Sequence, residues 1–310
     1  MNNSCTIDEH IFQRFFSKQI VSIECLKGAF QHQTNLIILE DDSKWVCKIF
    51  SHRTWLGTLD PLQIVSSNLL AETISARIAC TIAGKPTAMP SQALPALVIP
   101  YCEGEVLAKL NGQQAFKLGY LLAQLHALNL PPLKESKAFP KIHLPKGKSV
   151  PMWVLKMMEQ CNSKLQFEEN CWVVSHRDMH LNNIIWQDSN TPHLIDWESA
   201  GLIHPFVELI GLASNASGLA QCQFDADLFR STLEGYGSLN QRLPPAQMPL
   251  WELSAYSWLL WYVFVLEEGQ FNEAERTLQS LDFIMKKTKD LIDIYKQMEC
   301  HFHRKQVNTR

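Results

Sequence analysis

The sequence lacks the features that define several large classes of protein. Its nine cysteines include no Cys-x-x-Cys pair and no His/Cys group at zinc spacing, and its first residues, MNNSCTIDEH, lack the basic and then apolar pattern of a signal peptide. We therefore expect reduced cysteines and a cytoplasmic protein. The 310 residues carry a net charge of −3, so no basic field favours nucleic acid, which we exclude as a partner.

Long apolar runs are also missing. The longest, Tyr256 to Leu266, is too short to span a bilayer and contains a serine. We expect it to form a buried helix and predict no membrane segment. There is no internal repeat, and the 46% hydrophobic content suffices for the core of one large or two modest domains.

The order of the predicted elements favours an α+β fold. Three runs typical of strands, VSIECL, TNLIIL and KWVCKIF, lie between residues 20 and 50, with a polar turn at 40–44. Further predicted elements are helices at 69–82, 113–129, 151–167 and over much of the chain after residue 225, and a strand at 96–101. We therefore predict a small antiparallel-sheet lobe followed by a larger, mostly helical lobe.

The stretch SHRDMHLNNIIW, residues 175–186, concentrates polar side chains before an apolar strand. Asp178 and Asn183 have the H-R-D-x-x-x-x-N spacing of a kinase catalytic loop. Phosphoryl transfer needs a carboxylate that accepts the proton of the attacking hydroxyl and a neutral oxygen ligand for Mg²⁺, both held on one rigid loop. Taken alone, such a stretch is more often a capped turn, so neighbouring segments must decide between the two interpretations.

Two further segments agree with a kinase. Asp196 ends the apolar strand of HLIDWESAG and offers a second hard oxygen ligand for Mg²⁺, and a turn at 189–191 predicts a strand-turn-strand ribbon. Lys48 lies on the third predicted strand and Glu72 on the following helix, in the order of the pair with which a kinase holds the α- and β-phosphates. Four such elements in the right order favour a catalytic site over a turn.

The segments WVCKIF, HRDMHLNNIIW and LIDWESAG together resemble the aminoglycoside phosphotransferase and choline kinase superfamily, small-molecule kinases with a two-lobed protein-kinase-like fold. The resemblance covers most of the chain and implies ATP and Mg²⁺ as cofactors. It also implies a nucleotide-binding lobe at 1–99, a hinge at 100–105 and a catalytic and acceptor-binding lobe at 106–310. The implied roles are catalysis for His176 and Asp178, metal binding for Asn183 and Asp196, phosphate binding for Lys48, Glu72 and Gly28, and adenine binding for Pro100, Tyr101 and Cys102.

Departures from protein kinases favour a small-molecule acceptor. Asp196-Trp197-Glu198 replaces D-F-G, no A-P-E segment follows, and His180 stands where protein kinases usually carry Lys or Arg. The superfamily's usual Gly-Gly and then Asn is replaced by Gly28-Ala29 and then His32. Gly28 therefore serves either a phosphate clamp or a simple strand turn.

The Asp-Trp-Glu motif followed by ELIGLA resembles thiamine and choline or ethanolamine kinases more than the antibiotic-modifying branch. Acceptors of that branch are cationic alcohols, so an aromatic and acidic pocket is expected. A single helix across residues 251–271 would place Trp258 and Trp261 on roughly opposite faces, where each is either core or a cation contact. The candidate substrate contacts are Trp197, Glu198, Trp258, Trp261 and Glu267.

Three functions follow from these patterns. The first is ATP- and Mg²⁺-dependent phosphorylation of a hydroxyl on a small cationic metabolite. An aminoglycoside-type antibiotic phosphotransferase would instead need a wide acidic cleft, and a pseudokinase would bind nucleotide without turnover. His126 and His204 have no visible partner in the sequence and are predicted to be structural. The acceptor's identity, the choice of ATP over GTP and the oligomeric state stay open.

Overall fold

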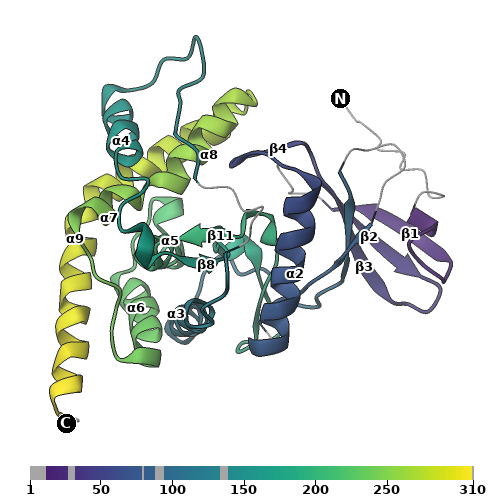
Figure 1. The fold of residues 1–310 in the computed structure, drawn as a ribbon, viewed down its shortest axis with the longest axis horizontal. Coiled ribbons are helices and arrows are strands. Elements are labelled where there is room, and N and C mark those ends of the chain that lie inside the picture. Colours follow the sequence, from purple (N-terminus) through teal and green to yellow (C-terminus); the bar gives the residue numbers. More distant parts are fainter. Residues whose placement is uncertain (1–11, 27–31, 79, 88–93, 133–138, 309–310) are drawn as a thin grey trace.

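The computed structural model describes residues 12–26, 32–78, 80–87, 94–132 and 139–308. Its N-terminal part contains the predicted antiparallel sheet, which has five strands including the unpredicted β6, and its C-terminal part is mostly helical (Figure 1). The strands, in spatial order, are β1 (Ile20–Cys25), β2 (Gln33–Leu39), β3 (Lys44–Ile49), β7 (Ala96–Pro100) and β6 (Lys85–Thr87). The chain thus has the predicted α+β architecture, in which a small sheet precedes a larger helical region.

The sheet alternates apolar and polar residues because one of its faces is buried. Ile37 and Leu39 on β2 pack with Phe12 in one small core. Helix α2 (Pro61–Ile78) lies beside the sheet and begins where Asp60 accepts a hydrogen bond from the Gln63 backbone N–H at 2.9 Å (Figure 1). This helix starts eight residues before the predicted position. The prediction missed its first turns because buried polar residues interrupt the apolar pattern there.

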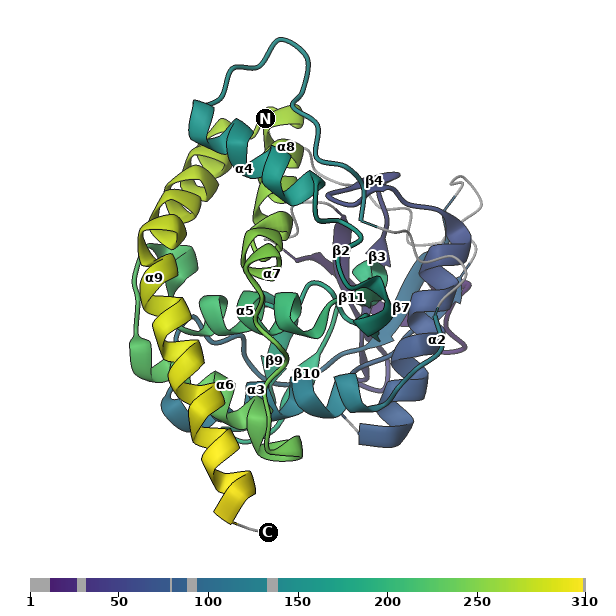
Figure 2. The same ribbon diagram turned by 60° about the vertical axis from the view of Figure 1, so that its left-hand side comes forward.

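The helical region is built around one large hydrophobic core. Its longest helix, α9, runs along the outside of the region, yellow in Figure 2. The helices are α3 (Gly112–Ala127), α4 (Met152–Asn162), α5 (Pro205–Ala216), α6 (Ala226–Asn240), α7 (Met248–Leu253), α8 (Tyr256–Glu267) and α9 (Phe271–Asn308). Among the described residues, no helix is both long and apolar enough to cross a bilayer.

The single helix predicted across 251–271 is wrong in one respect. A turn at Ser254 and Ala255 separates α7 from α8, so the faces counted along one uninterrupted helix do not apply. The buried helix predicted from Tyr256 is confirmed, because most residues of α8 are buried. Trp258 and Trp261 both lie on α8, three residues apart, so their directions differ by only about 60°.

Two short ribbons hold the polar segments of the sequence. The predicted ribbon is confirmed, with β9 (Ile184–Trp186) antiparallel to β10 (Pro192–Leu194). A second ribbon, which the sequence did not predict, pairs β8 (Val173–Ser175) with β11 (Gly201–Ile203). Since β8 leads into the H-R-D loop and β11 follows the Asp-Trp-Glu segment, the pairing brings both loops to one place.

A small hairpin connects the sheet to the helical region. It consists of β4 (Arg53–Thr54) and β5 (Gly57–Thr58) and follows directly after β3 (Figure 1). Its tip residues, Trp55 and Leu56, are buried in the core of the helical region rather than in the sheet. The hairpin therefore follows the strands of the sheet in the sequence, but its tip packs in the core of the helical region.

Candidate active site

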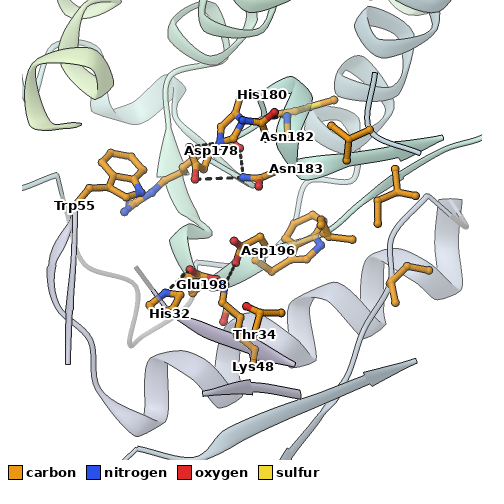
Figure 3. A pocket seen from close by; sticks show the side chains of 18 of the residues that line it. His32, Thr34, Lys48, Trp55, Asp178, His180, Asn182, Asn183, Asp196 and Glu198 are labelled. Atoms are coloured by element: carbon orange, nitrogen blue, oxygen red, sulfur yellow. Dashed lines mark hydrogen bonds and ion pairs between the residues drawn. The ribbon is translucent and has the colours of Figure 1, made fainter. Parts of the chain in front are cut away.

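A cavity of about 700 Å³ lies between the sheet and the helical region. Figure 3 shows Asp178 and Asn183 facing Asp196 across it, with Lys48 reaching in from the sheet. The predicted site residues that line it are Lys48, Pro100, Tyr101, Cys102, Asp178, Asn183, Asp196, Trp197, Glu198, Trp258 and Trp261. Segments distant in the sequence thus meet around one space.

The catalytic-loop aspartate is held by its own loop. Asn183 donates its side-chain N–H groups to the Asp178 backbone carbonyl at 2.9 Å and to the Asp178 carboxylate at 3.3 Å. His180 lies nearby, with its Nε2 3.6 Å from the other carboxylate oxygen. The Asp178 carboxylate is therefore oriented toward the cavity before any substrate arrives.

His176, expected to be catalytic, lies behind the cavity rather than in it. Its side chain is completely buried, its Nε2–H donates to the Ile195 carbonyl at 2.8 Å, and its Nδ1 accepts the Asp178 backbone N–H at 3.3 Å. Burial lowers the pKa of His176, which favours the neutral ring that these two bonds require. His176 therefore joins the two loops through hydrogen bonds and is not among the residues that line the cavity.

A buried network that sequence reasoning missed supports the catalytic loop. Arg177 has a left-handed backbone (φ 66°), and its N–H donates to Glu208 on α5 at 2.7 Å. The other Glu208 oxygen lies 2.8 Å from His126, whose Nδ1 is 2.8 Å from the Tyr236 hydroxyl. Burial alone would raise the pKa of Glu208, but the His126 hydrogen bond holds it low. His126 is therefore structural, as predicted, and Glu208 fixes a strained residue.

Asn183 and Asp196 fit a divalent metal ion. Because Asn183 uses its amide nitrogen on Asp178, its amide oxygen is the group available to a cation. The Ile195 N–H donates to the Asn183 carbonyl at 3.0 Å, which keeps Asp196 beside Asn183. The described residues contain no group of three or more His, Cys, Asp or Glu side chains that would hold a metal alone. One amide and one carboxylate suit Mg²⁺, which takes its remaining ligands from phosphates and water.

The predicted pair of Lys48 and Glu72 is not formed. Glu72 is exposed on α2 and accepts a hydrogen bond from Asn68 at 3.3 Å. Lys48 is buried and instead contacts Asp196 and the Glu198 carboxylate, the latter at 2.7 Å. Glu72 lies on the solvent side of α2 and forms no ion pair with Lys48. The lysine instead pairs with the loop that carries Asp196 and Glu198.

Glu198, expected to contact substrate, instead forms an ion pair with Lys48 and a hydrogen bond with His32. His32 Nδ1 accepts the Ser51 N–H at 3.1 Å, so its Nε2–H donates to Glu198 at 2.8 Å. Burial alone would raise the pKa of Glu198, but Lys48 and His32 hold it well below its usual range. For Lys48, burial lowers the pKa, and the negative charge of Glu198 only partly offsets this effect. His32, a departure from the superfamily pattern, thus joins the sheet to the acidic loop, whereas Gly28 lies outside the described residues.

The predicted adenine segment lines the sheet end of the cavity. Tyr101 donates its backbone N–H to the Lys44 carbonyl at 3.1 Å, which continues the pairing between β7 and β3. Pro100 and Cys102 flank it in the cavity wall. All three residues therefore border the cavity, and their contact with adenine stays a prediction.

The opposite end of the cavity is aromatic. Trp258 and Trp261 both line it, so the prediction that they lie on opposite faces is wrong, because residues three apart share one side of a helix. Trp261 donates its indole N–H to Glu273 on α9 at 3.3 Å, and Glu273 also lines the cavity. Glu267 does not line it, because Glu267 forms an ion pair with Arg53.

Two other tryptophans border the cavity. Trp197 is buried between the two loops, where its indole N–H donates to Thr81 and its ring packs on His176, so it serves mainly as structure. Trp55, from the β4–β5 hairpin, was not predicted and lines the same cavity as Asp178 (Figure 3). Trp55 and Glu273 carried no recognisable signal, because neither falls within a motif.

The fold and the site define a small-molecule phosphotransferase with a kinase-like architecture. The chain belongs to the phosphotransferase enzyme family, whose profile matches residues 26–242. No curated protein matches the sequence closely enough to count as a relative.

Solved structures share the fold at low sequence identity. The choline kinase of Streptococcus pneumoniae is 18% identical with a TM-score of 0.65, covering 88% of this chain and 98% of its own. An ethanolamine kinase of Plasmodium vivax is 12% identical with a TM-score of 0.60, covering 87% of this chain and 84% of its own. An amicoumacin kinase solved in complex with AMP-PNP, Ca²⁺ and Ami is 13% identical with a TM-score of 0.59, covering 96% of both chains.

Proposed function

We propose that the protein is an ATP- and Mg²⁺-dependent kinase that phosphorylates a hydroxyl of a small cationic metabolite, in the manner of thiamine, choline or ethanolamine kinases. The observation that carries the proposal is the single cavity bordered by Asp178, Asn183, Asp196 and Lys48 and continued by an aromatic end. Nucleotide-bound structures with the same fold support ATP as the donor.

The nucleotide would bind between the lobe at 1–99 and the lobe at 106–310, with its base against the hinge at 100–105. Because the Tyr101 N–H is already used within the sheet, we place the base against the backbone of Pro100 and Cys102. Lys48, held by Glu198, would contact the phosphates. Asn183 and Asp196 would hold Mg²⁺, which neutralises phosphate charge.

Asp178 would orient the acceptor hydroxyl and accept its proton as the phosphate is transferred. Its two bonds from Asn183 fix the carboxylate relative to the metal ligands. The protein would therefore act by positioning and electrostatics, without a covalent intermediate on a side chain.

The aromatic end favours an acceptor with a single positive group. Trp258 and Trp261 offer ring faces, and Glu273 is the one carboxylate among the described lining residues that lies outside the catalytic and metal groups, the Glu198 ion pair with Lys48 and the Glu208 network. A ring face with one nearby carboxylate suits a compact cation. An aminoglycoside carries several charges and would need more acidic side chains here.

The reaction is tested by incubating the protein with Mg-ATP and thiamine, choline, ethanolamine, homoserine or kanamycin, with labelled product as the readout. Asp178→Asn is the matched control, because it keeps the size of the side chain and removes the base. We expect acceptor-dependent product from one of the cationic alcohols and at least a 100-fold loss in the variant. Preferential phosphorylation of kanamycin would instead support the antibiotic-modifying alternative.

A second test separates a kinase from a pseudokinase. We expect ATP to raise the melting temperature more with Mg²⁺ than without it, because a ligand stabilises the state that binds it. Asp196→Asn should remove the increment due to Mg²⁺ and leave the metal-free shift. Nucleotide binding without any metal effect and without turnover would favour the pseudokinase.

A further inference from the structure

We infer that the β4–β5 hairpin forms the sheet-side wall of the acceptor site and that Trp55 is a specificity-determining residue for the acceptor. The inference rests on the proposed function. It adds a wall from the N-terminal part of the chain to a site otherwise built by the helical region.

Trp55 occupies the position that such a wall requires. It lines the same cavity as Asp178, Trp258 and Trp261, and Figure 3 shows its side chain among those that line the cavity with Asp178. It is nearly buried, at 7% exposure, in the core of the helical region. An acceptor hydroxyl directed at Asp178 would thus have the Trp55 ring next to the carbon that bears it.

The hairpin is rigid enough to act as a wall. The Thr54 hydroxyl accepts the Leu56 N–H at 3.2 Å and donates to the Gly57 carbonyl at 3.2 Å, which closes the turn around Trp55. Ser51 donates its hydroxyl to the Arg53 carbonyl at 2.9 Å at the base of the hairpin. A ring held in this way can exclude acceptors by shape, which a mobile loop cannot do.

An ionic clasp ties the hairpin to the helix that carries the other tryptophans. Arg53 pairs with Glu267 and, at 3.3 Å, with Glu268 at the end of α8, and its guanidinium lies 6.0 Å from the centre of the Phe264 ring. The clasp fixes the hairpin relative to Trp258 and Trp261 on the same helix. Arg53 is therefore a positioning residue, and Glu267 acts through it rather than on substrate.

The aromatic walls define the class of acceptor. Rings on two sides favour a compact alcohol whose body is apolar or carries a quaternary or protonated amine, and they leave little room for a highly hydrated polyol. A ring beside Asp178 also keeps water from competing with the acceptor hydroxyl. Removing the ring should therefore weaken acceptor selection and admit water.

The test compares Trp55→Leu and Trp55→Phe with Trp45→Phe, whose tryptophan lies on β3 outside this cavity. The KM for the acceptor found in the panel and the KM for ATP are measured for each protein, together with the rate of ATP hydrolysis by water. We expect Trp55→Leu to raise the acceptor KM at least tenfold and the ATP KM less than twofold. Trp55→Phe should restore most of the acceptor KM, and Trp45→Phe should match the wild type.

Hydrolysis by water supplies a readout where no alcohol in the panel reacts. It should rise at least threefold in Trp55→Leu and fall to background when Asp178→Asn is added. An unchanged acceptor KM and unchanged hydrolysis would overturn the inference, as would an equal rise of both KM values. If the wild type itself bound no nucleotide in the presence of Mg²⁺, the proposed function would fail and the inference with it.

Arg53→Gln tests the wall without touching the cavity, in case Trp55→Leu does not fold. Loss of the clasp should raise the acceptor KM about threefold at unchanged kcat and ATP KM. Because the ion pairs are partly exposed, added salt should reproduce part of this effect in the wild type and none in the variant. Wild-type parameters in Arg53→Gln, with no salt effect in either protein, would count against the clasp.

Discussion

At the residue scale, the site departs from the expected kinase in the partner of its lysine. Glu198 from the Asp-Trp-Glu segment holds Lys48, whereas the helix glutamate Glu72 is exposed. His32 stabilises Glu198 from the sheet at 2.8 Å. The lysine anchor and the metal aspartate therefore lie on one loop, and a shift of that loop would move both.

Glu198→Gln should lower kcat/KM for ATP about 100-fold, which corresponds to about 3 kcal/mol. The reason is that the buried lysine would keep only Asp196 as a charged partner, so it would lose its charge more readily and be held less firmly toward phosphate. Glu72→Gln is the matched control and should stay within twofold of the wild type in the same steady-state assay. The opposite ranking of the two variants would restore the helix glutamate as the anchor.

Local spacing predicted some of these residues and could not predict others. Asp178, Asn183 and Asp196 stand in short segments whose chemistry is evident from order and distance along the chain, and all three line the cavity. The contact between His32 and Glu198 joins positions 166 residues apart, and no local pattern encodes it. Such through-space pairs become visible only when the fold brings the segments together.

At the element scale, apolar patterns predicted four of the five strands of the sheet and most helices, but neither β6 nor the places where helices break. Ser254 and Ala255 interrupt α7 and α8 within an apolar stretch that reads as continuous. The β4–β5 hairpin was missed because its strands have two residues each, too few to show alternation. The hairpin brings Trp55 to the cavity wall, so this part of the site was the least predictable.

The crossing of α3 and α6 depends on close backbone contact. A Cβ added to Gly119 would lie 1.9 Å from the Thr232 carbonyl oxygen, whereas one added to Gly211 in α5 would meet nothing within 4 Å. Gly119→Ala should therefore lower the free energy of unfolding by about 2–3 kcal/mol through overpacking. Gly211→Ala should be neutral or stabilise by up to about 1 kcal/mol, since alanine favours a helix.

Urea unfolding of both alanine variants, followed by circular dichroism, measures this difference. Both substitutions add one methyl group within a helix, so propensity alone would stabilise both. Equal midpoints for the two proteins would show that α3 and α6 separate at little cost and that their crossing does not limit stability.

At the scale of the whole molecule, buried histidines predict how stability depends on pH. Burial lowers the pKa of His176 and His204, so the unfolded chain takes up protons more readily than the native protein below about pH 6.5. Their contribution is complete above that pH and is lost as the pH falls toward the folded pKa values. The lowered pKa values of Glu198 and Glu208 act in a separate window, since that stability is lost only below about pH 4.3.

The free energy of unfolding should therefore fall between pH 7.5 and pH 5.5, by at most about 1.4 kcal/mol per pH unit for each histidine. His204→Asn separates titration from structure, because His204 caps α5 by accepting the Phe206 N–H at 3.1 Å and asparagine is also a good N-cap. The variant should match the wild type at pH 7.5 and lose less stability at pH 5.5 in urea titrations. Parallel curves for the two proteins would mean that His204 takes up its proton in the native state as easily as in the unfolded chain.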